Sequence, residues 1–222
     1  MIQVSESFRS RHAAARLGFL AMTGVSNPPS NPALDAKKDE LERDLRGKYA
    51  GFDRPRLRQI PVIRAYDAYY RGFEKSYHVL LQLESVVLKG KPLPRVAALV
   101  EAMFMAELDS LILTAGHDLS SLRRPLLLDV ASSAESYEGM SGKTITCTPG
   151  DMLIRDAAGV VSSVLHGPDS RTRIMPETTS VLFTSYAPEG VGEGELRAHL
   201  ESIEGFVRLI SAGAETMELT LI

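Results

Sequence analysis

The sequence predicts a single α+β domain, and two observations carry that prediction. Apolar patterns with the period of a helix fill most of the first half of the chain, whereas short apolar runs separated by turn residues fill the second half. No linker longer than a turn separates the halves. The 222 residues fit one domain or two small ones. We therefore expect helices and strands to share one core across residues 1–222.

The first half is expected to hold one strand and four helices. Alternating apolar residues indicate the strand. Asn31 followed by Pro32 is typical of a helix start, because asparagine caps the first turn and proline fits its first position. Sparse apolar positions put that helix on the surface, whereas residues 95–113 are apolar almost all round and predict a buried central helix. The expected segments are a strand at 16–23 and helices at 32–46, from 61, at 77–89 and at 95–113.

The second half is expected to be rich in strands and to close with a helix. Turn sequences such as Thr148-Pro-Gly-Asp151 and Asp156-Ala-Ala-Gly159 separate the apolar runs. An apolar stripe at helical spacing between Leu196 and Ile210 predicts the closing helix. The expected strands are 126–131, 143–148, 152–155, 160–165, 180–186 and 217–222.

Composition excludes several classes of protein. The chain is 44% hydrophobic and 24% charged, as expected of a globular protein. Its apolar stretches fall short of the ~20 residues that a membrane-spanning helix needs. The first residues lack the apolar run of a secretory signal, and the one cysteine, Cys147, has no partner for an internal disulfide. We therefore expect a cytoplasmic protein without a membrane partner.

The net charge of −3 hides an uneven distribution. From Arg54 to Arg95, nine Lys or Arg residues stand against three acidic residues, whereas seven glutamates stand against two arginines from Pro188 onward. A basic stretch can neutralise phosphates locally whatever the total charge, although a solvated surface explains such stretches more often. The charge pattern leaves both interpretations open.

Familiar enzyme motifs fail on spacing. Gly142-Lys143-Thr144 lacks the glycine that a phosphate-binding loop needs five residues before Gly142, and Ser141 lacks the context of a nucleophile elbow. The five histidines and Cys147 show no paired spacing of metal ligands. We expect no metal and no cofactor.

Two polar segments are candidates for a site. Thr114-Ala-Gly-His117-Asp118 follows an apolar helix, so His117 could activate a water molecule. From the residues alone, a structural role, in which the histidine satisfies backbone groups at the helix end, is favoured over a catalytic one. Arg171 and Arg173 lie with several hydroxyl residues on a loop before a strand. That loop could bind phosphate or be held by its own hydrogen bonds.

Six short motifs together resemble a known family. In order they are Lys89-Gly-Lys-Pro-Leu-Pro-Arg95, Leu99-Val-Glu101, Gly116-His-Asp118, Thr148-Pro-Gly150, Asp169-Ser-Arg-Thr172 and Pro176-Glu-Thr178. They resemble the freestanding proteins of the phenylalanyl-tRNA synthetase beta-subunit B3/B4 domain family, over residues 58–210. The resemblance implies an α+β fold with a mixed or antiparallel, β-barrel-like sheet and packed helices. In the synthetase, this domain is an editing module that hydrolyses tyrosine wrongly attached to phenylalanine tRNA.

The resemblance also implies roles for individual residues. The editing histidine of the family matches His117, which favours a catalytic role for it. An asparagine of the family pocket matches Phe104, and its tyrosine-reading glutamate matches Thr184, so selectivity for tyrosine is not expected to carry over. Lys89, Lys91 and Arg95, with Arg171 and Arg173, are the expected contacts to nucleic acid.

Two hypotheses follow from the sequence. One is a tRNA-binding, editing-domain-like protein that hydrolyses mischarged aminoacyl-tRNA in trans, by orienting an already activated ester and one water. The other is a non-catalytic protein of the same fold that binds RNA or a small amino-acid-like ligand. His117 favours the first, whereas Phe104 and Thr184 favour the second. The sequence leaves the amino acid, the tRNA and the oligomeric state undetermined.

Overall fold

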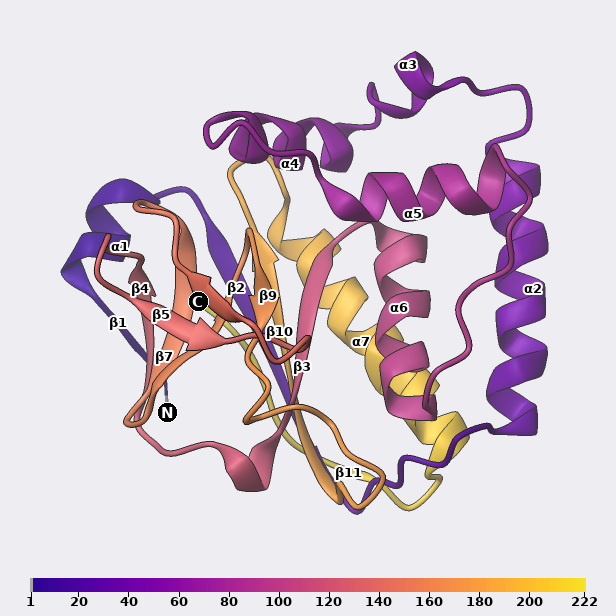
Figure 1. Ribbon diagram of the computed structural model, residues 1–222. Coiled ribbons are helices and arrows are strands. Elements are labelled where there is room, and N and C mark those ends of the chain that lie inside the picture. The colour runs from indigo at the N-terminus through magenta and orange to yellow at the C-terminus, as the bar shows by residue number, and fades with distance from the viewer. Residues whose placement is uncertain (1) are drawn as a thin grey trace.

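A computed structural model describes residues 2–222 and has most of its helices on one side and its strands on the other (Figure 1). The elements in chain order are β1 (Ile2–Val4), α1 (Glu6–Arg11), β2 (Arg16–Thr23), α2 (Pro32–Lys48), α3 (Arg54–Leu57), α4 (Pro61–Arg71), α5 (His78–Val87), α6 (Ala98–Ser110), β3 (Leu113–Asp118), the 3₁₀ turn η1 (Leu119–Ser121), β4 (Leu126–Val130), β5 (Ser136–Glu138), β6 (Thr144–Thr146), β7 (Met152–Asp156), β8 (Gly159–Ser163), β9 (Gly167–Pro168), β10 (Ser180–Ala187), α7 (Glu193–Ile210) and β11 (Glu215–Leu221). The predicted α+β class is confirmed.

Three separate sheets hold the strands. The four-stranded sheet has the order β11-β2-β10-β3 and is antiparallel throughout. The five-stranded sheet has the order β1-β4-β7-β8-β9, with β1 parallel to β4, and β5 pairs with β6 alone. The five-stranded sheet is therefore mixed and the four-stranded sheet is antiparallel, as expected. The expected barrel-like closure is wrong, because the strands of residues 2–222 form three open sheets.

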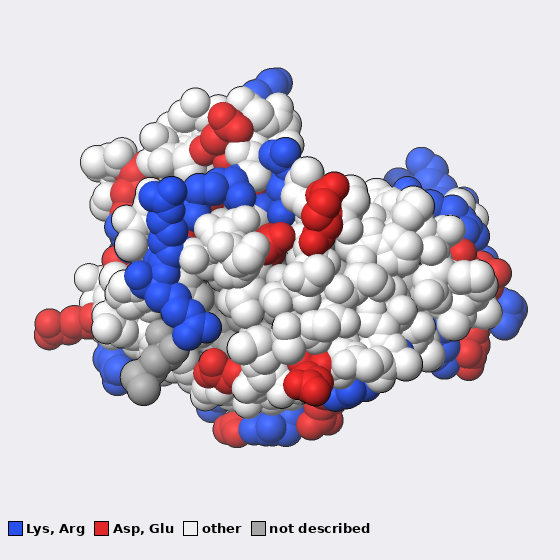
Figure 2. Space-filling model, turned by 90° about the horizontal axis from the view of Figure 1, so that it is seen from below, with Lys and Arg blue, Asp and Glu red and all other residues white. Residues whose placement is uncertain are grey.

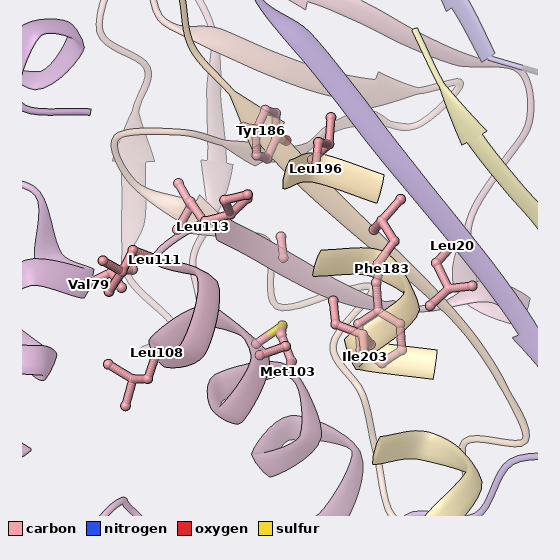
Figure 3. Close-up of a cluster of buried hydrophobic side chains, with 14 of the residues drawn as sticks. Leu20, Val79, Met103, Leu108, Leu111, Leu113, Phe183, Tyr186, Leu196 and Ile203 are labelled. Carbon is pink, nitrogen blue, oxygen red and sulfur yellow. The ribbon is translucent and has the colours of Figure 1, made fainter. Parts of the chain in front are cut away.

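The core lies between α6, α7 and the four-stranded sheet (Figure 3). Met103 of α6 points toward the sheet, Leu108 of α6 lies below Val79 of α5, and Ile203 of α7 lies beside Phe183 of β10. All five side chains are at most 8% exposed. Burial of apolar surface on this scale is the main force that holds the helices against the sheet.

Several predicted elements are confirmed almost to the residue. The strand at 16–23 is β2. Asn31 caps α2 as expected, since its side chain accepts the backbone N–H groups of Ala33 and Leu34. α2 is more buried than expected of a surface helix: Lys38 and Glu42 are buried in addition to its leucines. Lys38 is stabilised there by an ion pair with the buried Glu101.

The region around residue 113 differs from the sequence prediction. The helix expected at 95–113 ends at Ser110, because Leu111 adopts a left-handed conformation with φ of 64°, and the next residues form strand β3. Two tyrosines stabilise this break. Tyr77 Oη donates to the Leu111 carbonyl at 2.8 Å, and Tyr66 Oη accepts the Leu113 N–H at 2.9 Å. The signal for the break therefore lies more than thirty residues away.

Candidate ligand cavity

A cavity of about 260 Å³ lies between α6, β3 and the loop that follows β9; we call it the ligand cavity. Apolar side chains dominate its wall, and a few polar groups converge on it. This combination is typical of small-molecule binding sites. The lining residues are His78, Val100, Met103, Phe104, Glu107, Leu113, Thr114, Ala115, Gly116, Met140, Ser163, Gly167, Pro168, Arg173, Ile174 and Tyr186.

The close approach of β3 to its neighbours depends on Gly116. A Cβ atom at this position would lie 2.8 Å from Ile174 Cδ1 and 3.4 Å from Met103 Sδ, both of which belong to lining residues. The glycine thus leaves room for Ile174 and Met103 to line the cavity beside the strand.

Two of the predicted site residues, Phe104 and Arg173, line the ligand cavity. Phe104 projects from α6 and also lines a neighbouring cavity of about 330 Å³ between α5 and residues 92–94. His78 is shared between the two cavities in the same way. Phe104 and His78 therefore stand where the two cavities meet.

His117 lies elsewhere, between the two large sheets, and is 0% exposed. Its Nδ1 is 2.8 Å from Thr172 Oγ1, and the Thr172 hydroxyl donates to Asp169. Because that hydroxyl has a single proton, Nδ1–H of His117 is the donor to Thr172 and Nε2 carries the lone pair. Nε2 is buried without a hydrogen-bond partner. Burial and the nearby Arg171 lower the pKa of His117 to about 3, so the ring is neutral at physiological pH.

Thr184 is also outside the ligand cavity. It lies on β10 between β2 and β3, is 0% exposed, and its Oγ1 is 3.4 Å from the Ala115 carbonyl. The structure therefore brings Phe104 and Arg173 to one cavity and leaves His117 and Thr184 in the layer behind it.

The residues expected to contact nucleic acid fall into two groups. Lys89, Lys91 and Arg95 are exposed on the connection between α5 and α6, where Arg95 Nη1 is 2.9 Å from Asp35 Oδ1. Arg171 is occupied within the protein, since it pairs with Asp156 at 3.0 Å and Asp169 at 3.3 Å. In the view of Figure 2, most Lys and Arg lie toward two ends of the molecule, and the area between them is mainly uncharged with a few Asp or Glu side chains.

Three polar groups at or next to the cavity were not singled out by sequence reasoning. Glu107 and Ser163 line the wall, and His199 lies one layer behind it. The His199 ring is buried between Ser110 Oγ, 2.8 Å from Nδ1, and Thr114 Oγ1, 2.6 Å from Nε2. The sequence signal that could have indicated Glu107 and His199 is their position on helix faces that are otherwise apolar.

Glu107 is the one carboxyl group in the cavity wall. One oxygen accepts the Thr114 N–H at 2.7 Å, and no other hydrogen bond to this carboxyl is present within residues 2–222. Burial raises the pKa of Glu107 to about 8, opposed by the hydrogen bond from Thr114. At neutral pH the cavity therefore holds a protonated acid that can donate a hydrogen bond to a ligand or give up its proton to a cationic one.

We expect stability to fall as pH rises from about 6.5 to 8, because folded Glu107 keeps a proton that the unfolded chain has released. The free energy of unfolding should decrease by about 1.4 kcal/mol per pH unit, and Glu107→Gln should remove this dependence. Urea unfolding at half-unit pH steps measures both slopes. An unchanged slope in the variant would show that Glu107 is ionised in the folded protein.

No group of three or more His, Cys, Asp or Glu side chains that could hold a metal ion is found within residues 2–222. In the same part of the chain, none of the helices has the length and apolarity needed to cross a membrane.

Comparisons with known proteins show the fold. Neither a known family model nor a curated protein matches this chain. Among solved structures, it is similar to an N-terminal fragment of the phenylalanyl-tRNA synthetase beta subunit from Pyrococcus horikoshii, with a TM-score of 0.50 and 10% identity. The match covers 97% of this chain and 50% of that fragment. The chain thus shares a fold with part of a synthetase beta subunit and spans half of the fragment's length.

Proposed function

We propose that the chain is a tRNA-binding protein of the B3/B4 type, and that its ligand cavity receives the amino-acid side chain of an aminoacylated tRNA. One observation carries the proposal: an apolar cavity with a single carboxyl group lies beside α6 in a fold similar to a synthetase beta-subunit fragment. A tRNA carrying an amino acid joins an apolar or aromatic group to a polyanion, and the chain offers a cavity for the first and exposed Lys and Arg residues for the second. The expected compartment is a reducing cytoplasm, since the single cysteine, Cys147, is buried and free.

The size and lining of the cavity favour a small, mainly apolar group. Its 260 Å³ lie below the roughly 300–1,000 Å³ of pockets for drug-sized ligands. Phe104 and Met103 offer an aromatic face and a thioether, which favour an aromatic or branched apolar ligand. Glu107 adds one polar contact inside the cavity.

Binding is better supported than hydrolysis. General base catalysis works best with a pKa near the operating pH, whereas burial holds the pKa of His117 at about 3 and its ring does not line the cavity. One observation favours hydrolysis as a second function: the Asp169–Thr172 pair fixes the tautomer of His117 and leaves Nε2 unpartnered. A water admitted beside Nε2 would find an acceptor there.

A panel of tRNAs, each carrying a different amino acid, tests the proposal. Retention on the purified protein measures binding, and release of the amino acid measures hydrolysis. We expect retention that depends on the amino acid, with aromatic or branched apolar residues favoured, and little difference between tyrosyl and phenylalanyl tRNA. Equal affinity for charged and uncharged tRNA would show that the cavity does not receive the amino acid.

Phe104→Ala is expected to weaken binding of the preferred aminoacyl-tRNA by about tenfold, or ~1.4 kcal/mol, because the ligand loses an aromatic wall. Leu88→Ala is the matched control, since Leu88 is an exposed apolar residue outside both cavities. Equilibrium binding with charged and uncharged tRNA measures the effect. Equal losses in the two variants would contradict a role for the cavity.

A further inference from the structure

A third cavity, of about 500 Å³, lies beside α3 and α4, the helices at the top of Figure 1. It is lined by Arg54, Pro55, Arg58, Gln59, Arg64, Asp67 and Arg71, and we call it the arginine cavity. It shares no lining residue with the ligand cavity. Four arginines and one carboxylate thus face the same space.

Local structure explains why the arginines converge. Arg64, Asp67 and Arg71 are spaced three and four residues apart on α4, so they project from one face of that helix. Arg54 begins α3 and Arg58 caps its end, one turn later. Pro55 and Pro61 hold the backbone near the starts of α3 and α4 in the conformation that a helix needs. The wall is therefore built from backbone of restricted freedom.

The charges in this cavity are only partly compensated. Arg58 Nε lies 2.8 Å from Asp67 Oδ2, and Arg54 Nε lies 2.9 Å from the buried Glu84 Oε1. Neither Arg64 nor Arg71 has an acidic partner within residues 2–222. Arg71 Nε donates to the backbone carbonyl of Asp67 at 3.1 Å, which leaves its other N–H groups available. Two ion pairs fix the wall, and two further guanidinium groups keep their charge.

We propose that the arginine cavity binds a phosphate group. Guanidinium groups that share a cavity repel one another, and a phosphate group, with one negative charge in a diester and about 1.5 to 2 in a monoester, offsets that repulsion. The planar fork of an arginine matches phosphate oxygens in bidentate hydrogen bonds, which a lysine does not provide. Two sources offer this chemistry: the backbone of an RNA and a small molecule with a free phosphate or diphosphate. The site shares no residue with the ligand cavity and does not involve His117. With RNA as the source, it rests on the proposed function and adds a phosphate contact to the proposed tRNA binding; with a small phosphorylated molecule as the source, it is independent of that function.

The double variant Arg64→Gln/Arg71→Gln tests the site without breaking either ion pair. The control is Arg43→Gln/Arg197→Gln, which removes the same charge from two exposed arginines outside the arginine cavity. Two probes separate the sources: a labelled RNA hairpin with a single-stranded 3′ end, measured by fluorescence anisotropy at several salt concentrations, and inorganic pyrophosphate, measured by calorimetry. Urea unfolding of both variants checks that they are folded.

We expect the cavity variant to lose at least tenfold in affinity for one of the two probes at low salt, while the control loses less than threefold. If RNA is the source, the salt dependence of log affinity should also become shallower by about 1.4–1.8, because each phosphate contact contributes ~0.7–0.9. A loss confined to pyrophosphate assigns the site to a small phosphorylated molecule. Equal affinities in the two variants, or a wild type that binds neither probe, would overturn the proposal. The two binding measurements do not depend on whether the ligand cavity receives an amino acid, because neither probe carries one.

Discussion

Thr184→Glu is expected to destabilise the protein by about 3–5 kcal/mol, because it places an unpaired carboxylate at a position that is fully buried from solvent. Thr184 is fully buried and lies on β10, with β2 on one side and β3 on the other. Its hydroxyl Oγ1 makes a long approach of 3.4 Å to the Ala115 carbonyl and also lies near the Tyr186 hydroxyl. The midpoint of urea unfolding measures the loss.

Thr184→Val is the control, since it keeps the branched shape and removes only the hydroxyl. We expect this change to cost about 1 kcal/mol or less, because the hydrogen bond it removes is long. If Thr184→Glu stays as stable as wild type and increases the preference for tyrosyl tRNA, Thr184 contacts the ligand as the family resemblance implies. The structure instead favours a large loss of stability.

The second large effect is a steep loss of stability in acid. Burial lowers the pKa of both His117 and His199 to about 3, whereas the unfolded chain binds these protons near pH 6.5. Between these values the unfolded state holds two more protons, so stability falls as pH falls. The raised pKa values of Glu107, about 8, and Asp151, about 6, oppose this effect down to about pH 4.

Between pH 4 and 3 the opposition from Glu107 and Asp151 fades, but the folded histidines also begin to bind protons near pH 3. We therefore expect a net loss of about 1–2 kcal/mol per pH unit, below the roughly 2.7 kcal/mol that two fully neutral rings would give. His199→Gln should halve the contribution of the histidines. Urea unfolding as a function of pH gives the slopes, and the imidazole NMR signals give the protonation of each ring directly. A histidine signal from either position that titrates near pH 6.5 in the folded protein would contradict the prediction.

The fold could be predicted largely where the sequence signal is local. The cap at Asn31, the stripe of α7 and the turn at Asp156–Gly159 are each decided by residues a few positions apart, and all three appear as expected. β3 was missed because both its faces are covered, by α6 on one side and the second sheet on the other, so its residues show no alternation. The tyrosines that end α6 contact it only in the folded chain.

The candidate site was harder to predict than the fold. Phe104, which the family resemblance matches to a pocket residue, lines the ligand cavity, and so does Arg173, which was expected to contact nucleic acid. Burial of a given side chain depends on which layers pack against its strand, and the sequence does not show these layers. Leu182, directly across from His117 on β10, is buried in the same layer, and nothing in the local sequence distinguishes such a layer from a cavity wall. Glu107 was not predicted because it is one of three acidic residues of α6, with Glu101 and Asp109, and the sequence does not show which of them faces a cavity.

The order of strands in the four-stranded sheet has a consequence for how the chain folds. β10 lies between β2 and β3, so Phe183 pairs with Leu20 on one side and with Gly116 on the other. No strand in this sheet pairs with its neighbour in the sequence. Long loops must therefore close before the first strands of this sheet can pair. We expect this to slow folding relative to proteins built from local contacts. During synthesis, β2 stays without a pairing strand until the ribosome has passed residue 187, and its apolar residues depend on chaperones or transient contacts until then.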